Sequence, residues 1–232
     1  MIIKNEIKSN DIELLIYDVD GTIVEFKTLF DLLKESFEIH GIPFKNEYFA
    51  MYTKAVMSVL DKNSKSFNYD NLSSCLEKSL PILKSHNICG TKYLNTLLNL
   101  EYKYTHLCEG ADDTIADLSD YFTQVISTNW FKSSQIMKIN KYGLIGYFDN
   151  IFTCENFYPK PNKKHFTNIL DLYGVDKRKT LVIGDSYSDV FASNYGLNSL
   201  LVDYNGNKRD IYEYSNIVVS ELHDIKKLLL KK

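Results

Sequence analysis

The stretch that decides the fold is Glu13-Leu14-Leu15-Ile16-Tyr17-Asp18-Val19-Asp20-Gly21-Thr22. Its apolar run is followed at once by acids and a glycine, a pattern typical of a buried strand that ends in a tight turn. Short apolar runs recur later in the chain, at residues 122–127, 151–153, 180–183, 199–202 and 217–219. Helical patterns separate them, at residues 112–121, 163–173, 187–196 and 221–231. Strands that alternate with helices predict an α/β fold, a Rossmann-like parallel sheet with helices on both faces.

The region from about residue 28 to residue 108 has a different pattern of apolar residues. Its apolar residues recur at helical spacing, as Leu29, Leu32, Leu33 and Phe37 do, and it contains no convincing strand. The sequence therefore predicts an all-helical insert after the first strand. We expect an α/β core made of residues 1–25 and 109–232, interrupted by a helical domain made of residues 26–108.

The overall charge and composition exclude several classes of protein. The 232 residues contain 27 basic residues (Lys and Arg) and 30 acidic ones, a net charge of −3, and 44% of them are hydrophobic. This near-neutral balance argues against bulk attraction to nucleic acid or to an anionic membrane. No run approaches the roughly 20 apolar residues of a membrane helix, and Met1–Lys8 holds no apolar stretch of signal-peptide length. We expect a cytoplasmic protein with no nucleic-acid or membrane partner.

The cysteines argue against a zinc site. Cys75, Cys89, Cys108 and Cys154 form no C-x-x-C pair, and no histidine cluster accompanies them. We expect reduced, partly buried thiols.

Polar residues stand where successive predicted strands end. Asp18 and Asp20 follow the first strand, and Thr128 and Asn129 follow the second. Lys160 follows the third strand of this series, and Asp185 and Asp189 follow the fourth. Ligands of open α/β sheets bind beyond the carboxyl ends of the strands. We therefore expect these acids, the hydroxyl and the lysine to converge on one rim.

The chemistry of this set points to phosphoryl transfer. Carboxylates this close repel one another unless a cation or a shared proton intervenes, and oxygen-only ligands suit Mg²⁺. Lys160 and Thr128 then remain to hold an anion. Each piece alone also has a structural interpretation, because a D-x-D pair is often a turn and a G-D-x-x-x-D run is often a capped helix start. Their joint occurrence at successive strand ends favours a site.

These motifs resemble those of the haloacid dehalogenase superfamily, in its phosphatase branch with a helical cap, which includes phosphoglycolate phosphatase-like and β-phosphoglucomutase-like proteins. Its D-x-D-G-T motif corresponds to Asp18–Thr22, and its strand ending in Ser or Thr corresponds to Val125–Asn129. Its K-P and G-D-x-x-x-D motifs correspond to Lys160-Pro161 and Gly184–Asp189. The helical insert matches the family's cap by its position in the chain and by its helical apolar pattern.

The resemblance implies a role for each residue. Asp18 is expected to be the nucleophile, forming an aspartyl-phosphate, and Asp20 the general acid and then base. Thr128, Asn129 and Lys160 are expected to bind the phosphoryl group. Asp18, Asp20 (through its carbonyl), Asp185 and Asp189 are expected to hold Mg²⁺, with Asp189 either a direct ligand or a partner of one. Because Ser127 directly precedes Thr128, a one-residue shift in the second motif remains open.

Three functions remain open. The first is a Mg²⁺-dependent phosphatase that acts on a small phosphorylated metabolite, the second is a sugar-phosphate phosphomutase, and the third is a non-catalytic binding module. Asp20 favours the first two over a dehalogenase, which has no leaving oxygen to protonate. The chain is expected to be a monomer or a homodimer. Tyr48, Tyr52, Lys54 and Lys103 are candidate specificity residues in the insert, although aromatic residues at this spacing more often pack inside a bundle.

Overall fold

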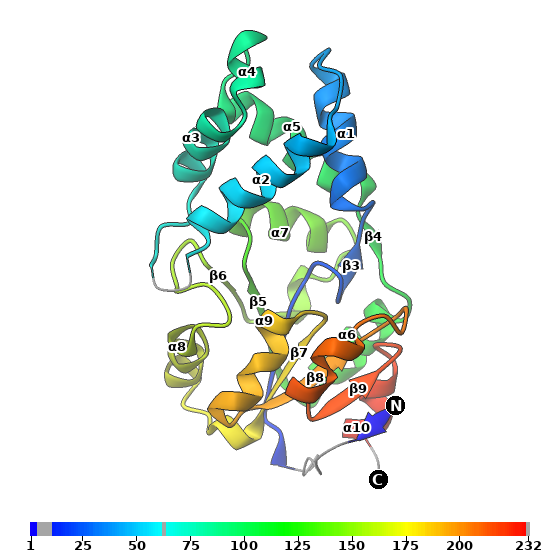
Figure 1. Ribbon diagram of the computed structural model, residues 1–232. Coiled ribbons are helices and arrows are strands. Elements are labelled where there is room, and N and C mark those ends of the chain that lie inside the picture. The colour runs from blue at the N-terminus through cyan, green and yellow to red at the C-terminus, as the bar shows by residue number, and fades with distance from the viewer. Residues whose placement is uncertain (4–10, 62–63, 231–232) are drawn as a thin grey trace. The chain divides into compact units, whose positions relative to one another are not determined.

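The computed structural model describes residues 1–3, 11–61 and 64–230 (Figure 1). Of the expected features, most of Met1–Lys8 and the last residue of the predicted helix 221–231 lie outside these residues. The chain divides into two compact units. One consists of Met1–Glu25 with His106–Lys232, and the other of Phe26–Thr105. Among the described residues, no helix combines the length and the apolar character that crossing a membrane requires.

The first unit is built on a seven-stranded sheet with the order β1-β9-β8-β7-β2-β5-β6. All neighbouring strands are parallel except β1 and β9, which are antiparallel. The α/β fold with a parallel sheet is thereby confirmed. The strands are β1 (Ile2–Ile3), β2 (Leu14–Tyr17), β5 (Thr123–Thr128), β6 (Asn150–Thr153), β7 (Thr180–Gly184), β8 (Asn198–Val202) and β9 (Ile217–Val219).

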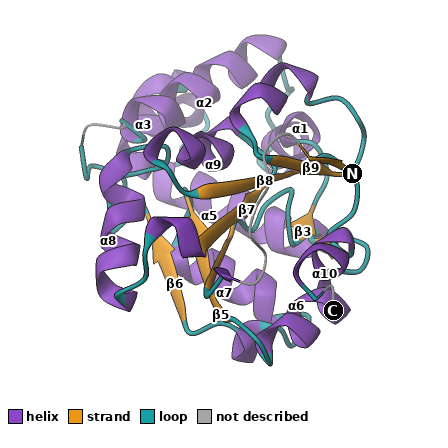
Figure 2. Ribbon diagram, turned by 90° about the horizontal axis from the view of Figure 1, so that it is seen from below, coloured by secondary structure: helices purple, strands orange, loops and turns teal. Residues whose placement is uncertain are grey.

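Helices cover both faces of this sheet because the strand residues alternate between two apolar clusters. Leu15 and Tyr17 pack in one cluster with α6 (Ala111–Ser119), α7 (Lys132–Asn140) and α10 (Asp224–Leu229). Leu14 and Ile16 pack in the other with α8 (Lys163–Tyr173). Figure 2 shows α8 on one side of the sheet and α6 and α10 on the other.

The strand order explains why the predicted polar residues meet. From β2 the chain passes to β5 and β6 on one side, and then returns to β7, β8 and β9 on the other. Tyr17 is level with Ile126 of β5 and with Ile183 of β7. The residues that follow these three strands therefore share one edge, at the point where the strand order reverses and where such sheets bind ligands.

Short elements complete the first unit. They are β3 (Val24–Glu25), β4 (His106–Leu107), α9 (Tyr187–Val190) and the 3₁₀ turns Ile145–Tyr147, Lys177–Lys179, Phe191–Tyr195 and Arg209–Tyr214. The helix expected at 187–196 is thus a single α-helical turn that tightens into a 3₁₀ turn and ends at Gly196, whose φ is 84°. The helix expected at 221–231 begins only at Asp224. The pair β3–β4 was not anticipated, because two-residue strands carry no periodic pattern.

The second unit has no strand among its described residues. Its helices are α1 (Leu29–Ile39), α2 (Asn46–Val59), α3 (Tyr69–Ser79), α4 (Pro81–Ser85) and α5 (Gly90–Tyr104). Phe37 of α1 lies at the centre of an aromatic group, with ring centroids 4.9 Å from Tyr48 and 5.0 Å from Tyr93. Tyr48 therefore packs within the bundle, and Lys103 forms an ion pair with Glu35.

A buried histidine ties β5 to the loop that precedes α8. His165 Nδ1 lies 2.6 Å from the Tyr158 carbonyl oxygen, and Nε2 lies 2.8 Å from Ser127 Oγ. Because a carbonyl only accepts, Nδ1 carries the proton and Nε2 accepts from the Ser127 hydroxyl. Burial, reinforced by the charge of Lys160, lowers the pKa of His165 to about 3. The imidazole is therefore neutral in the folded protein at neutral pH.

We predict that His165 makes the stability of the protein depend on pH. The pKa is lower in the folded state than in the unfolded state, so the stabilisation is complete above about pH 6.5 and is lost as the pH falls below it. His165→Gln should destabilise the protein most at neutral pH. By about pH 5.5 the difference from wild type should shrink by about 1.4 kcal/mol. Urea unfolding of both proteins across this range measures it, and a difference that does not change with pH would contradict a neutral, buried His165.

Candidate active site

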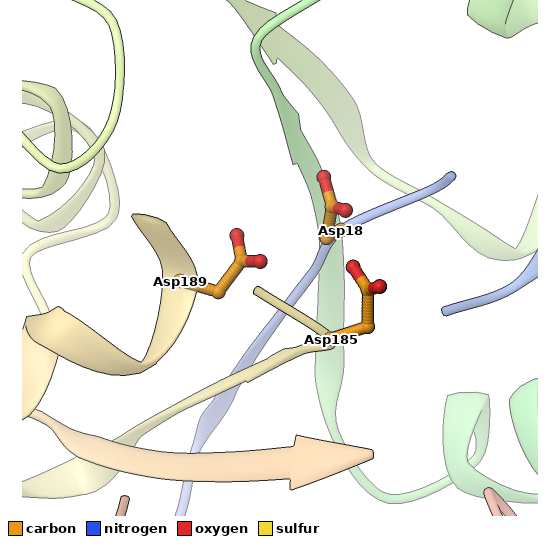
Figure 3. A group of neighbouring side chains, drawn as sticks. All are labelled: Asp18, Asp185 and Asp189. Atoms are coloured by element: carbon orange, nitrogen blue, oxygen red, sulfur yellow. The ribbon is translucent and has the colours of Figure 1, made fainter. Parts of the chain in front are cut away.

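Three carboxylates meet at the carboxyl edge of the sheet. Asp18 follows β2, and its N–H donates to the Ile183 carbonyl at 2.9 Å, while Asp185 and Asp189 come from the end of β7 and from α9. One oxygen of each lies within 4.8 Å of the others. Figure 3 shows the three side chains gathered at this edge. Three of the four acids that were expected to converge therefore lie together in the fold.

Two glycines make this close approach possible. Gly21 has a φ of 84°, and a Cβ there would lie 2.4 Å from Asp185 Oδ2. A Cβ on Gly184 would lie 2.3 Å from Asp189 Cγ. Any larger residue would collide with an acid at either position, and at Gly21 it would also adopt a strained backbone.

Lys160 lies among these acids, and its side chain is only 2% exposed. Its Nζ is 2.8 Å from Asp18 Oδ1, 2.5 Å from Asp189 Oδ1 and 2.7 Å from the Ser127 carbonyl oxygen. Asn129 fixes the backbone of the lysine, since its side chain accepts from the Lys160 N–H at 2.8 Å and donates to the Lys160 carbonyl at 2.9 Å. The side chain of Asn129 thus holds the lysine loop, and only its backbone remains available for the predicted phosphate contact.

The charges around Asp18 do not balance. Burial raises the pKa of Asp18 well above its ordinary value; Asp189 and Asp185 add to the rise, while Lys160 opposes it. Burial also raises the pKa of Asp185, with a further contribution from Asp189 and opposition from Lys208. Burial alone would lower the pKa of Lys160, but the two acids beside it outweigh that effect and raise the pKa. The lysine is therefore charged, and the three acids outnumber their lysine partners, Lys160 and Lys208, by one.

Within the cluster of three acids, Asp189 has both carboxylate oxygens engaged. Oδ1 accepts from Lys160, and Oδ2 accepts from the N–H of Ser186 at 3.2 Å and from its hydroxyl at 2.5 Å. The side chain is 1% exposed. Of the two roles expected for Asp189, these contacts favour that of a partner which holds Lys160 and the start of α9.

Asp185 has a lysine partner that no motif indicated. Lys208 Nζ lies 2.5 Å from Asp185 Oδ2. The loop carrying Lys208 is anchored by Asp203, whose carboxylate accepts from the N–H groups of Asn207 and Lys208 and from the Tyr212 hydroxyl. Asp185 is thus partly neutralised by a side chain from the loop after β8.

Asp20 is held apart from the three clustered acids by two residues of α7. Lys138 Nζ is 2.8 Å from Asp20 Oδ1, and Gln135 Nε2 is 2.7 Å from Asp20 Oδ2. The same Gln135 nitrogen lies 3.2 Å from Thr128 Oγ1. The Ser127 hydroxyl instead bonds to His165. Of the two adjacent hydroxyls, that of Thr128 is therefore the one joined to the Asp20 group.

The donor set fits a hard divalent cation. The groups near Asp18 offer only oxygen, with no histidine or cysteine in the cluster of three acids. Burial first, and then the neighbouring acids, raise the pKa of Asp18 and of Asp185, and a bound divalent cation would oppose both effects. Asp18 and Asp185 are the members best placed to give oxygens, since both oxygens of Asp189 already accept hydrogen bonds.

Comparisons with known proteins find similar sequences among hydrolases. The chain is 28% identical over 180 residues to the HAD-hydrolase YfnB of Bacillus subtilis, covering 74% of this chain and 75% of that one. It is 25% identical to a phosphoglycolate phosphatase of Nitrosococcus oceani, over 94% of this chain and 96% of that one. The pyrimidine 5'-nucleotidase YjjG of Escherichia coli is 32% identical over 46% of this chain and 49% of its own.

Solved structures show the same fold. The structure of Bacillus subtilis YfnB, which is bound to magnesium, superposes with a TM-score of 0.76 at 22% identity, covering 95% of this chain and 99% of that one. The β-phosphoglucomutase-like structure from Thermotoga maritima gives a TM-score of 0.70 at 17% identity, covering 94% of this chain and all of that one.

The sequence model of one family spans most of the chain, including the ends of β2, β5 and β7. It matches residues 15–202 and describes haloacid dehalogenase-like hydrolases. The motifs, the sheet order and this match agree, and the chain belongs to the haloacid dehalogenase-like hydrolase family.

Proposed function

We propose that the protein is a Mg²⁺-dependent phosphatase that hydrolyses a small phosphomonoester through an aspartyl-phosphate at Asp18. One observation carries the proposal. The Asp18 carboxylate lies 2.8 Å from the ammonium of a buried lysine, Lys160, beside Asp185 and Asp189, and a second acid follows two residues later. This is the set of groups that phosphoryl transfer to a carboxylate requires.

Each step uses groups of this chain. A carboxylate oxygen of Asp18 attacks phosphorus, the bond from phosphorus to the ester oxygen breaks, and Asp20 gives its proton to that oxygen. Water then attacks phosphorus, its proton passes to Asp20, and the bond to Asp18 breaks to release phosphate. Lys160 and Thr128 hold the phosphoryl oxygens, together with the Asn129 backbone. Asp18, Asp185 and the Asp20 carbonyl would hold Mg²⁺, assisted by Asp189, and the ion would neutralise phosphoryl charge.

The relatives support this choice of reaction and metal. Phosphoglycolate phosphatase and pyrimidine 5'-nucleotidase both cleave phosphate esters of small molecules, and the YfnB structure contains magnesium.

Interdomain movement is described for YfnB. We propose that residues 26–108 act here as a cap that selects the substrate, and that the protein works in the cytoplasm, as a monomer or a homodimer, without a nucleic-acid or membrane partner.

Asp18→Asn should lower Mg²⁺-dependent hydrolysis by at least roughly 1,000-fold, because the amide cannot form the phosphoenzyme. Release of inorganic phosphate from a panel of phosphorylated metabolites, with Mg²⁺ or with EDTA, measures this. Asp113→Asn, which changes an exposed acid on α6, is the matched control and should behave as wild type. Full activity of Asp18→Asn would exclude the proposed nucleophile, and conversion of a hexose phosphate to its isomer without phosphate release would make the protein a phosphomutase.

Lys208→Met should tighten Mg²⁺ binding by about threefold to tenfold, because it removes a positive charge that lies 2.5 Å from Asp185. Isothermal titration calorimetry of the substrate-free protein measures the affinity directly. Lys179→Met is the control, since this lysine pairs with Glu13 just before the amino end of β7. Equal Mg²⁺ affinity of wild type and Lys208→Met would show that Lys208 does not compete with the cation.

A further inference from the structure

Two polar side chains of α7 are buried where the helix passes Asp20. Gln135 and Lys138 are three residues apart, so they lie on the same face of the helix, and both are fully buried. Their side chains hold the two carboxylate oxygens of Asp20, Lys138 holding Oδ1 and Gln135 holding Oδ2. Neither residue belongs to the motifs that identify the family.

The burial of Lys138 needs a physical reason. An ammonium taken out of water is costly unless a charged partner compensates it, and a lysine also loses side-chain entropy when it is fixed. The carboxylate of Asp20 is such a partner at 2.8 Å, and the Asp20 side chain is 27% exposed. A charge and an amide therefore fix the two carboxylate oxygens, while the side chain stays partly exposed.

Gln135 also fixes the separation between the Asp20 carboxylate and the Thr128 hydroxyl. Its amide nitrogen has two hydrogens, and Asp20 Oδ2 and Thr128 Oγ1 lie 2.7 Å and 3.2 Å from it. One amide group therefore spans the carboxylate and the hydroxyl. Since Thr128 is proposed to hold a phosphoryl oxygen, this bridge keeps the carboxylate beside the bond that breaks.

We propose that Gln135 and Lys138 are positioning residues that hold the Asp20 side chain beside Thr128, where its protonated form can deliver a proton to the ester oxygen. The inference rests on the proposed function. It assigns these two residues to one step, protonation of the leaving group, and to neither the attack by Asp18 nor the binding of Mg²⁺.

A pair of esters separates this role from a general structural one. The leaving group of 4-nitrophenyl phosphate departs as a stable phenolate, so its transfer to Asp18 needs little protonation. Benzyl phosphate has a ring of the same size, but it leaves as an alkoxide that must be protonated as the bond breaks. The ratio kcat/KM reports events up to formation of the phosphoenzyme, and so excludes the later use of Asp20 as a base.

Lys138→Met should lower kcat/KM for benzyl phosphate by about 30- to 100-fold, within the range of general acid catalysis, and for 4-nitrophenyl phosphate by less than about threefold. Gln135→Leu should change the two esters in the same unequal way and provides a second test if Lys138→Met folds poorly. Lys138→Arg should recover part of the lost benzyl phosphate activity, because it restores the charge. Lys132→Met, on the same helix and partly exposed, is the matched control.

The outcomes separate this inference from the proposed function. An unequal loss in Lys138→Met and Gln135→Leu supports the positioning role, and an equal loss for both esters, or no loss, overturns it while wild type remains active. Binding of beryllium fluoride with Mg²⁺, followed by ¹⁹F NMR, should be retained in both variants, because it depends on Asp18. A wild-type protein that hydrolyses neither these esters nor the metabolite panel, and binds no beryllium fluoride, overturns the proposed function and this inference with it.

Discussion

The site depends on the burial of one lysine between two acids. Lys160 Nζ touches Asp18, Asp189 and the Ser127 carbonyl, so a single ammonium joins the ends of β2 and β5 to α9. A buried ammonium without acids, or buried acids without it, would be strongly destabilising. The surrounding contacts keep this group in place. The Asn129 side chain forms hydrogen bonds with the N–H and the carbonyl of Lys160. His165 links the Ser127 hydroxyl to the Tyr158 carbonyl, in the loop that precedes α8.

Each acid at this edge has a lysine of its own or shares one. Asp18 and Asp189 share Lys160, Asp185 pairs with Lys208, and Asp20 pairs with Lys138. The proposed nucleophile lies among the three clustered acids, while the carboxylate of the proposed proton donor is held by Lys138 and Gln135 of α7. This separation would let two carboxylates only two residues apart perform opposite tasks.

Membership of the haloacid dehalogenase-like hydrolases accounts for the core of the site, and the second unit is the part that we propose selects the substrate. The family match spans residues 15–202, which include the acids and the lysine of the site. The unit Phe26–Thr105 contains only helices among its described residues, and Phe37, Tyr48 and Tyr93 pack at its centre. Under the proposal that residues 26–108 act as a cap, the candidates for substrate choice belong among its other side chains, of which Lys54 is exposed.

The sequence by itself determined the α/β fold, its principal strands and the set of acids, because short apolar runs that end in charged residues are local patterns. It also indicated Lys160, because that residue stands in a motif. Only the tertiary structure brought Gln135, Lys138 and Lys208 to the site. Lys138 is 118 residues from Asp20, Lys208 is 23 from Asp185, and a glutamine and a lysine on a helix resemble a solvated face. Their burial and their partners arise from the packing of α7 and of the loop after β8 against strand ends distant in sequence, and no local pattern encodes such packing.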